Sequence, residues 1–183
     1  MTTEIQRKRK AWSVLIVSTL AFTVCFMVWM MFGVIGIPIK KLLNLNATQF
    51  GLLTATPVLT GSLIRVPLGI WTDRYGGRIV MTLLMAATVP AIWLMAYATA
   101  YWHFLVIGLF VGLAGGSFSV GTPYVARWFA SNRQGMAMGI YGAGNSGSAV
   151  NKFIAPVLLV AFGLNIVPQV YAAIMAGAVV LFW

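Results

Sequence analysis

Apolar residues recur along this chain in six long runs, separated by short segments that carry charges, prolines or glycines. A membrane-spanning helix needs about 20 consecutive, mostly apolar residues, and these runs reach or approach that length. The segments between the runs are short, so consecutive helices are expected to be antiparallel neighbours. We therefore predict six helices, over residues 12–37, 47–70, 79–99, 104–127, 136–160 and 167–183.

The breaks between the runs carry turn or charge signals. The clearest are Pro38 with Lys40-Lys41, Asp73-Arg74 before Gly76-Gly77, and Ser131-Asn132-Arg133. The last run differs, because the 16 residues from Pro168 to Trp183 are shorter than a usual span and lack a polar exit. We expect the chain to stop inside this sixth helix and to be the first part of a longer protein.

Composition agrees with an all-α, polytopic membrane protein. Hydrophobic residues make up 61% of the 183 residues and charged residues 8%, with a mean hydropathy of +0.93. A soluble domain averages about 25% charged residues. A signal peptide does not explain the apolar character, which extends along the whole length. The single cysteine, Cys25, excludes an internal disulfide, and no spacing suggests a metal or other cofactor.

The net charge of +10 is interpreted as a topology signal rather than as a nucleic-acid surface. Eight of the 12 Lys and Arg residues fall on one predicted side of the membrane, and only Lys40 and Lys41 fall on the other. Cytoplasmic segments collect Lys and Arg. We therefore expect a basic cytoplasmic tail over residues 1–11, then a helical bundle over 12–183 in the inner membrane of the cell.

Two cations, Arg65 and Lys152, fall inside predicted spans. Charge within a membrane costs at least about 2.5–3.5 kcal/mol on insertion scales and therefore tends to mark a functional site. Small neighbours of Arg65 favour an interior position over snorkelling to the interface, and its guanidinium has a planar fork suited to a flat oxyanion. For Lys152, proton coupling, charge balance for an anion, and snorkelling stay open. Neither acidic residue, Glu4 in the tail or Asp73 in a loop, is expected to pair with them.

Two predicted helices are rich in small residues. Gly108, Gly112 and Gly116 form a ridge at four-residue spacing, which lets another helix approach closely. The helix over 136–160 carries GIYGAGNSGSAVNKF, residues 139–153, with small residues on more than one side. We expect close neighbours on more than one side of this helix, which would make it central rather than lipid-facing.

The loop GIWTDRYGGR, residues 69–78, resembles the signature between helices 2 and 3 of the major facilitator superfamily. The resemblance implies a bundle that forms the N-terminal half of a transporter and a loop that acts as a conformational latch between two halves. One position departs from the signature, since Gly77 stands where Arg or Lys is common. The residues that match are Gly69, Asp73, Arg74, Gly76 and Arg78.

A closer resemblance, to the nitrate/nitrite porter family, covers nearly the whole chain. It rests on the glycine-rich segment 139–147, on LIRVPLG at 63–69, on AFTVCFMVWMMF in the first helix and on AGGSFSVG in the fourth. It implies a substrate-binding arginine, two phenylalanines that sandwich a planar anion, and an asparagine and glycine beside it. By position these are Arg65, Phe26, Phe118, Asn145 and Gly144. The partner arginine of family helix 8 has no counterpart in this chain.

These observations predict a secondary transporter, not an enzyme, that moves nitrate or nitrite by alternating access, with proton symport as one option. Its partners would be the anion, protons, the lipid bilayer and a C-terminal six-helix half. Two alternatives stay open. One is a facilitator carrier for another small anion or a drug, and the other is a six-helix anion channel. A membrane enzyme lacks support, because the chain has one histidine and no acidic dyad.

Overall fold

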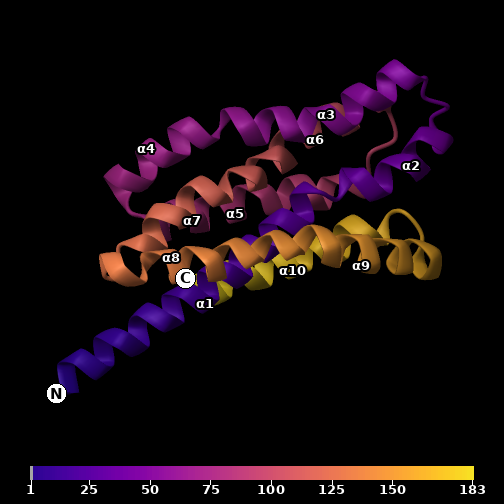
Figure 1. Cartoon of the computed structure of the whole chain (residues 1–183). Coiled ribbons are helices and arrows are strands. Elements are labelled where there is room, and N and C mark those ends of the chain that lie inside the picture. The colour runs from indigo at the N-terminus through magenta and orange to yellow at the C-terminus, as the bar shows by residue number, and fades with distance from the viewer. Residues whose placement is uncertain (1) are drawn as a thin grey trace.

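A computed structural model describes residues 2–183, which fold into helices joined by short turns (Figure 1). Within this range the helices line up end to end as six rods, one for each predicted helix. Their members, in chain order, are α1 (Thr2–Trp29) with α2 (Phe32–Leu42), α3 (Ala47–Leu63) with α4 (Arg65–Tyr75), α5 (Gly77–Met95), α6 (Tyr101–Gly112) with η1 (Leu113–Gly116) and α7 (Ser117–Ala126), α8 (Ser131–Gly142) with η2 (Ala143–Ser146) and α9 (Gly147–Phe162), and α10 (Ile166–Phe182).

The all-α class predicted from the apolar runs is confirmed. In the described part of the chain four helical stretches are long and apolar enough to cross a membrane, and Ile166–Phe182 is apolar but shorter. The rod over residues 131–162 is not among the four, because glycine, serine, asparagine and lysine interrupt its apolar residues. The four stretches are Glu4–Leu42, Ala47–Tyr75, Gly77–Met95 and Tyr101–Ala126.

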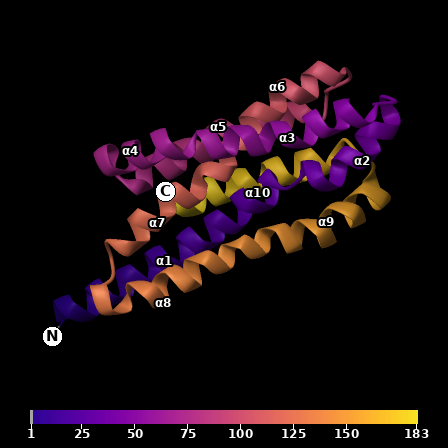
Figure 2. The ribbon, with the colours of Figure 1, turned by 45° about the horizontal axis from the view of Figure 1, so that its top comes forward.

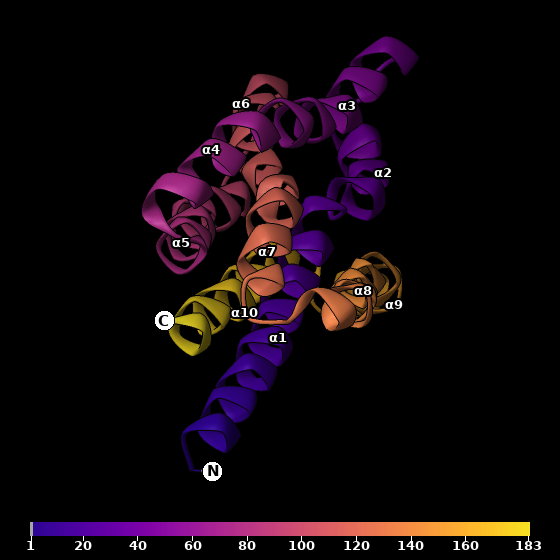
Figure 3. The ribbon, with the colours of Figure 1, turned by 60° about the vertical axis from the view of Figure 1, so that its left-hand side comes forward.

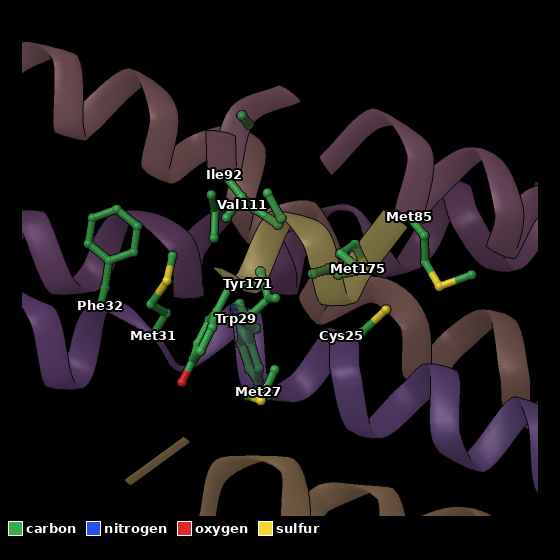
Figure 4. Close-up of a cluster of buried hydrophobic side chains, with 14 of the residues drawn as sticks. Cys25, Met27, Trp29, Met31, Phe32, Met85, Ile92, Val111, Tyr171 and Met175 are labelled. Atoms are coloured by element: carbon green, nitrogen blue, oxygen red, sulfur yellow. The ribbon is translucent and has the colours of Figure 1, made fainter. Parts of the chain in front are cut away.

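Helix α1 runs through the middle of the bundle, between α10 on one side and α8 and α9 on the other (Figure 2). Viewed from another side, α3 and α4 lie along α6 and α7, whereas α5 packs on α10 and α6 (Figure 3). The main core lies where α1, α5, α6 and α10 meet, around Cys25, Met85, Val111 and Tyr171 (Figure 4). These side chains come from four rods, so the core ties the bundle together.

The first predicted break is wrong in position. Pro38 lies inside α2, which continues to Leu42. The turn comes later, where Asn44 adopts a positive φ of 50° and Asn46 caps α3. The Asn46 side chain accepts a hydrogen bond from the Gln49 amide at 2.8 Å, and the Gln49 side chain accepts one from the Asn46 amide at 3.1 Å. This reciprocal capping box satisfies two amides at the helix start.

The second predicted break, between α4 and α5, is a turn of one residue instead of a loop. Asp73 and Arg74, expected in a loop, belong to the last turn of α4, and a single residue, Gly76, separates α4 from α5. Its φ of 88° lies in the left-handed region that glycine adopts without a steric cost. Gly77 then packs on the Tyr124 side chain, where a Cβ would clash. The helices therefore reverse direction over one glycine.

Two further features were not predicted. Helix α1 begins at Thr2, so residues 2–11 of the expected basic tail are helical. The first rod is also interrupted at Met30 and Met31, between α1 and α2. The Met30 carbonyl accepts a hydrogen bond from the side-chain amide of Asn151 at 2.9 Å, and the Tyr171 hydroxyl donates to the other end of that amide at 2.8 Å. A buried polar link thus joins three rods at the break.

Candidate functional site

Arg65 is the first residue of α4, immediately after an interruption of the second rod at Ile64. Pro67 explains the interruption, since it has no amide to donate to the Leu63 carbonyl four residues earlier. The Arg65 side chain is exposed, and its guanidinium carbon lies 5.8 Å from the centre of the Trp29 ring. The break therefore places a cation beside an aromatic residue of α1.

No carboxylate of this chain neutralises Arg65. The sequence has two acidic residues. Glu4 pairs with Lys8 at 3.0 Å, and Asp73 pairs with Arg127 at 2.7 Å. Within residues 2–183 the guanidinium fork of Arg65 has neither a salt bridge nor a hydrogen bond, so its donors are available to an anion.

Five aromatic side chains lead away from Arg65, and we call them the aromatic chain. Neighbouring ring centroids are 5.2 Å apart from Trp29 to Phe26, 5.6 Å from Phe26 to Phe22, 5.6 Å from Phe22 to Phe118 and 4.9 Å from Phe22 to Tyr141. Such spacings are typical of favourable aromatic pairs. Trp29 is 8% exposed, whereas Phe118 is 42% exposed. The aromatic chain thus begins beside a cation and ends with a ring on the surface.

Hydrogen bonds fix two members of the aromatic chain, Trp29 and Tyr141, to the backbone of other rods. The Trp29 indole N–H donates to the Pro57 carbonyl at 2.9 Å, and the Tyr141 hydroxyl donates to the Ser117 carbonyl at 3.0 Å. These bonds cross between rods, from α1 to α3 and from α8 to α7. Buried Tyr and Trp usually find such partners, which restrict the rings in orientation as well as in position.

The structure brings some of the predicted substrate residues together and leaves others apart. Phe26 and Phe118 both pack against Phe22. Gly144 is buried against the same ring, where a Cβ would clash. Asn145 is exposed, but its side-chain amide donates to the Gly142 carbonyl of its own rod at 2.8 Å.

Lys152 is also exposed, on α9. It lies seven residues beyond Asn145, which corresponds to about 10 Å along a helix. Among the described residues no salt bridge or hydrogen bond links Lys152 to the aromatic chain.

The small residues of the fifth rod have close neighbours on one side only, which corrects the expectation of neighbours on more than one side. Gly144 and Gly147 pack on α1, and a Cβ at Gly147 would lie 2.9 Å from the Met27 amide nitrogen. Gly135, Gly139 and Gly142 have open space where a Cβ would point. The glycine ridge of the fourth rod, in contrast, packs as expected, with Gly112 directly against the Pro57 backbone.

The five residues predicted to form a latch lie around the junction of α4 and α5. Asp73 bonds to Arg127 and so links the end of α4 to the end of α7. The guanidinium carbon of Arg74 lies 5.5 Å from the centre of the Tyr75 ring, and that of Arg78 lies 5.0 Å from the centre of the Trp183 ring. Gly76 forms the turn, and Gly69 has open space at its Cβ position.

Sequence reasoning missed Trp29, Phe22 and Tyr141, which join the predicted residues into one cluster. One signal was available, because Phe22, Phe26 and Trp29 follow each other at helical spacing and therefore share a face of α1. Their contact with Phe118 and Arg65 depends on how the rods pack and has no local signal. The clustering is thus a property of the tertiary structure.

Comparison with known proteins places this geometry in context. The model of the Major Facilitator Superfamily matches residues 17–183. A probable nitrate/nitrite antiporter, NarK1 of Thermus thermophilus, is 42% identical over 174 residues, which cover 88% of this chain and 39% of the relative. The nitrite extrusion protein of Bacillus subtilis (strain 168) is 34% identical over 159 residues, covering 86% of this chain and 40% of the relative.

A solved structure supports the fold. The crystal structure of a bacterial homolog of the human lysosomal transporter Spinster, inward-facing and unoccupied, matches with a TM-score of 0.76 at 19% identity. The match covers 94% of this chain and 41% of that chain. The chain therefore spans about two fifths of the length of the transporters it matches, and these similar proteins are transporters, not enzymes.

Proposed function

Because this chain belongs to the Major Facilitator Superfamily, we propose that it is part of a secondary transporter that moves nitrate or nitrite across a membrane by alternating access. Its similarity to proteins named nitrate/nitrite antiporter and nitrite extrusion protein supports the substrate class. The observation that carries the proposal within this chain is the exposed guanidinium of Arg65, which has no acidic partner and stands at one end of the aromatic chain.

The chemistry of this arrangement suits a small planar oxyanion. A guanidinium offers parallel N–H donors that bind two oxygens of one anion, and this geometry distinguishes arginine from lysine. We propose that Arg65 binds the anion in this way and that Phe26 and Phe118 cover its faces. Asn145 would donate to the anion by giving up its bond to the Gly142 carbonyl, and Gly144 lets α1 approach closely.

Transport by this superfamily fold involves two halves that rock about a site near the membrane midplane. We propose that a second helical half, in addition to residues 12–183, completes the site over the exposed side of Phe118 and Asn145. The Asp73–Arg127 pair and the open face at Gly69 would form one side of the latch, with Arg74, Gly76 and Arg78 holding the turn between α4 and α5.

The proposed orientation follows from the distribution of charge. The basic residues of the chain start, of the α4–α5 turn and of the α7–α8 connection would face the cytoplasm, across the inner membrane from Lys40 and Lys41. Lys152, exposed on α9, is assigned either to proton coupling or to balancing the charge of the anion.

The test is saturable uptake of nitrate and nitrite by the complete protein in cells that lack other transporters for these anions. We expect Arg65→Ala to abolish uptake and Arg65→Lys to weaken anion binding severely, since an ammonium does not reproduce the planar fork. Lys41→Ala is a matched control, because it removes an exposed cation from a helix end outside the site.

Three outcomes would contradict parts of this proposal. If a well-expressed protein takes up neither anion, the alternative of a carrier for another small anion or a drug would be favoured. Uptake that never saturates would favour a channel. Near-normal affinity in Arg65→Lys would remove the bidentate role.

Proton coupling is tested separately, by following internal pH during nitrate entry. Symport predicts acidification that Lys152→Gln reduces more than it reduces nitrate entry itself. Nitrate entry without any proton movement would remove symport and leave charge balance as the role of Lys152.

A further inference from the structure

A basic cavity lies at the end of the bundle where α1 begins, and none of its lining residues is among those proposed to bind the transported anion. It has a volume of about 440 Å³ and lies between the first turns of α1 and the connection from α7 to α8. Its lining includes four cations, Arg7, Lys8, Arg127 and Arg133, against one acid, Glu4. The electrostatic character of this cavity is therefore strongly positive.

Two of these cations have no acidic partner within the described residues. Glu4 is paired with Lys8, and Arg127 is paired with Asp73, which accounts for both acidic residues of the sequence. Arg7 and Arg133 line the same cavity from different helices, α1 and α8, and neither forms a salt bridge within the described residues. Two uncompensated guanidinium groups around one space favour a bound oxyanion such as a phosphodiester.

The walls of the cavity are held in place by specific contacts. The Trp12 and Phe129 rings meet edge to face with centroids 6.1 Å apart, and this contact attaches α1 to the α7–α8 connection. The Gln134 side-chain amide donates to the Ala126 carbonyl at 3.1 Å and to the Phe129 carbonyl at 3.2 Å. The connection that carries Arg127 is therefore held in place by contacts with α1 and with α8.

An apolar surface continues from the basic cavity. Lys8 and Trp12 also line a second cavity of about 490 Å³, whose other walls include Ile5, Ile16 and Val17. Ile16 is 54% exposed, and Leu20, one turn further along α1, is 49% exposed. A positive cavity followed by an apolar strip along a membrane helix matches a molecule with an anionic head and a hydrocarbon tail.

We propose that this paired surface binds an anionic glycerophospholipid, with its phosphodiester between Arg7 and Arg133 and one acyl chain along Trp12 and Ile16. Basic pockets between helices at the cytoplasmic face bind such head groups, and tryptophans are enriched at that level of the membrane. The site goes beyond the proposed transport function and does not depend on it. Its leaflet follows from the proposed orientation of the chain.

Native mass spectrometry of the protein in detergent tests this proposal, with titrations of dioleoyl phosphatidylglycerol, dioleoyl phosphatidylcholine and inorganic phosphate. We expect tighter binding of phosphatidylglycerol than of phosphatidylcholine. A cation near the membrane surface contributes about a fivefold factor in binding. The double variant Arg7→Gln/Arg133→Gln should therefore weaken phosphatidylglycerol binding at least about fivefold and weaken phosphatidylcholine binding less, because the choline cation already offsets the charge of its phosphodiester.

The matched control is Lys40→Gln/Lys41→Gln, which removes two cations at the other end of the bundle and should keep the wild-type preference. A third variant, Ile16→Ser, should weaken binding of both lipids, because it removes apolar contact from the acyl chain and leaves the cations intact. It also provides a test if the arginine variant does not fold.

Two results would overturn the proposal. One is an unchanged preference for phosphatidylglycerol in Arg7→Gln/Arg133→Gln, or unchanged lipid binding in Ile16→Ser. The other is binding of inorganic phosphate that displaces phosphatidylglycerol completely, which would identify the cavity as a site for a free anion instead of a lipid.

Discussion

The two 3₁₀ segments, η1 and η2, have similar composition and opposite surroundings. Each joins two α-helices within one rod, and each is rich in small residues, with the sequence LAGG in η1 and AGNS in η2. Residues 114–116 of η1 are all buried, and a Cβ at Gly115 would lie 2.6 Å from the Trp29 ring. In η2 only Gly144 is buried, and the other three residues are exposed.

This difference separates what local sequence determines from what packing determines. Glycine, and in η2 also asparagine and serine, weaken the preference for regular α-helix, so a tighter turn forms in both rods. Neighbouring rods then bury residues 114–116 of η1, while α1 covers only one side of η2. We infer that η1 is a fixed packing point of this bundle and that the open side of η2 is available to a second half.

The largest effects are expected at the glycines that flank these segments on their packed sides. Gly112→Val and Gly147→Val should each lower the free energy of unfolding by about 3 kcal/mol, because overpacking forces backbones apart. A Cβ at Gly112 would lie 2.6 Å from the Pro57 carbonyl oxygen. Denaturant unfolding in detergent measures the loss. Gly139→Val, on an open side, is the control, and equal losses at all three positions would contradict the comparison.

Asn151 tests the packed side of the rod that contains η2, because its side chain is buried there. Asn151→Leu keeps the branching of the side chain at Cγ but leaves the Met30 carbonyl and the Tyr171 hydroxyl without this partner. We expect a loss of about 1–2 kcal/mol, the range for hydrogen bonds between membrane helices in model peptides. The same unfolding assay applies, with Tyr171→Phe as a second variant. If both variants have the same free energy of unfolding as the wild type, the polar link does not stabilise this side of the rod.

Tyr141 connects the two regions directly, through its bond to the Ser117 carbonyl next to η1. Tyr141→Phe removes that bond while it keeps the ring that stacks on Phe22. A single interhelical hydrogen bond in a membrane averages about 0.6 kcal/mol, so we expect a loss of that size. A double-mutant cycle with Gly147→Val should be close to additive, and strong coupling would mean that the two sides of the rod move together.

The smallest effect is expected on the open side of the η2 rod. Gly142 has no atom within 4 Å of its Cβ position. Gly142→Ala should therefore cause no loss of stability, and should raise the free energy of unfolding by about 0.5 kcal/mol, the low end of the difference between glycine and alanine in a helix. A large loss would show that the side chain meets a neighbour and that this side is not open.

Several features of the fold were predictable because they depend on local composition. Apolar runs identified the six rods, and the spacing of Gly108, Gly112 and Gly116 identified a ridge that does pack closely. The cap of α3 was missed although its signal is present, since Asn46 precedes Gln49 by three residues, the spacing of a capping box.

The break at Met30 and Met31 is different, because its stabilising partners lie on other rods and leave no local pattern. The same reason limits prediction of the candidate site. Resemblance pointed to Arg65, Phe26 and Phe118 one at a time, but their connection through Trp29 and Phe22 depends on how rods from distant parts of the sequence pack. Asn145 shows another limit, since its amide satisfies a carbonyl of its own rod. Such an intrahelical bond follows from the 3₁₀ geometry at η2.

The link between Asn151 and the Met30 carbonyl has a consequence for biosynthesis. The two residues are 121 positions apart, and ribosomes add about 5–20 residues per second. The Met30 carbonyl therefore exists for roughly 6–24 s before the amide that binds it is synthesised. During that interval the nascent segment enters the membrane without this hydrogen bond, and the interruption at Met30 and Met31 gains its partner only when the fifth rod packs beside it. Insertion of the first rod and completion of its shape are thus separate events in time.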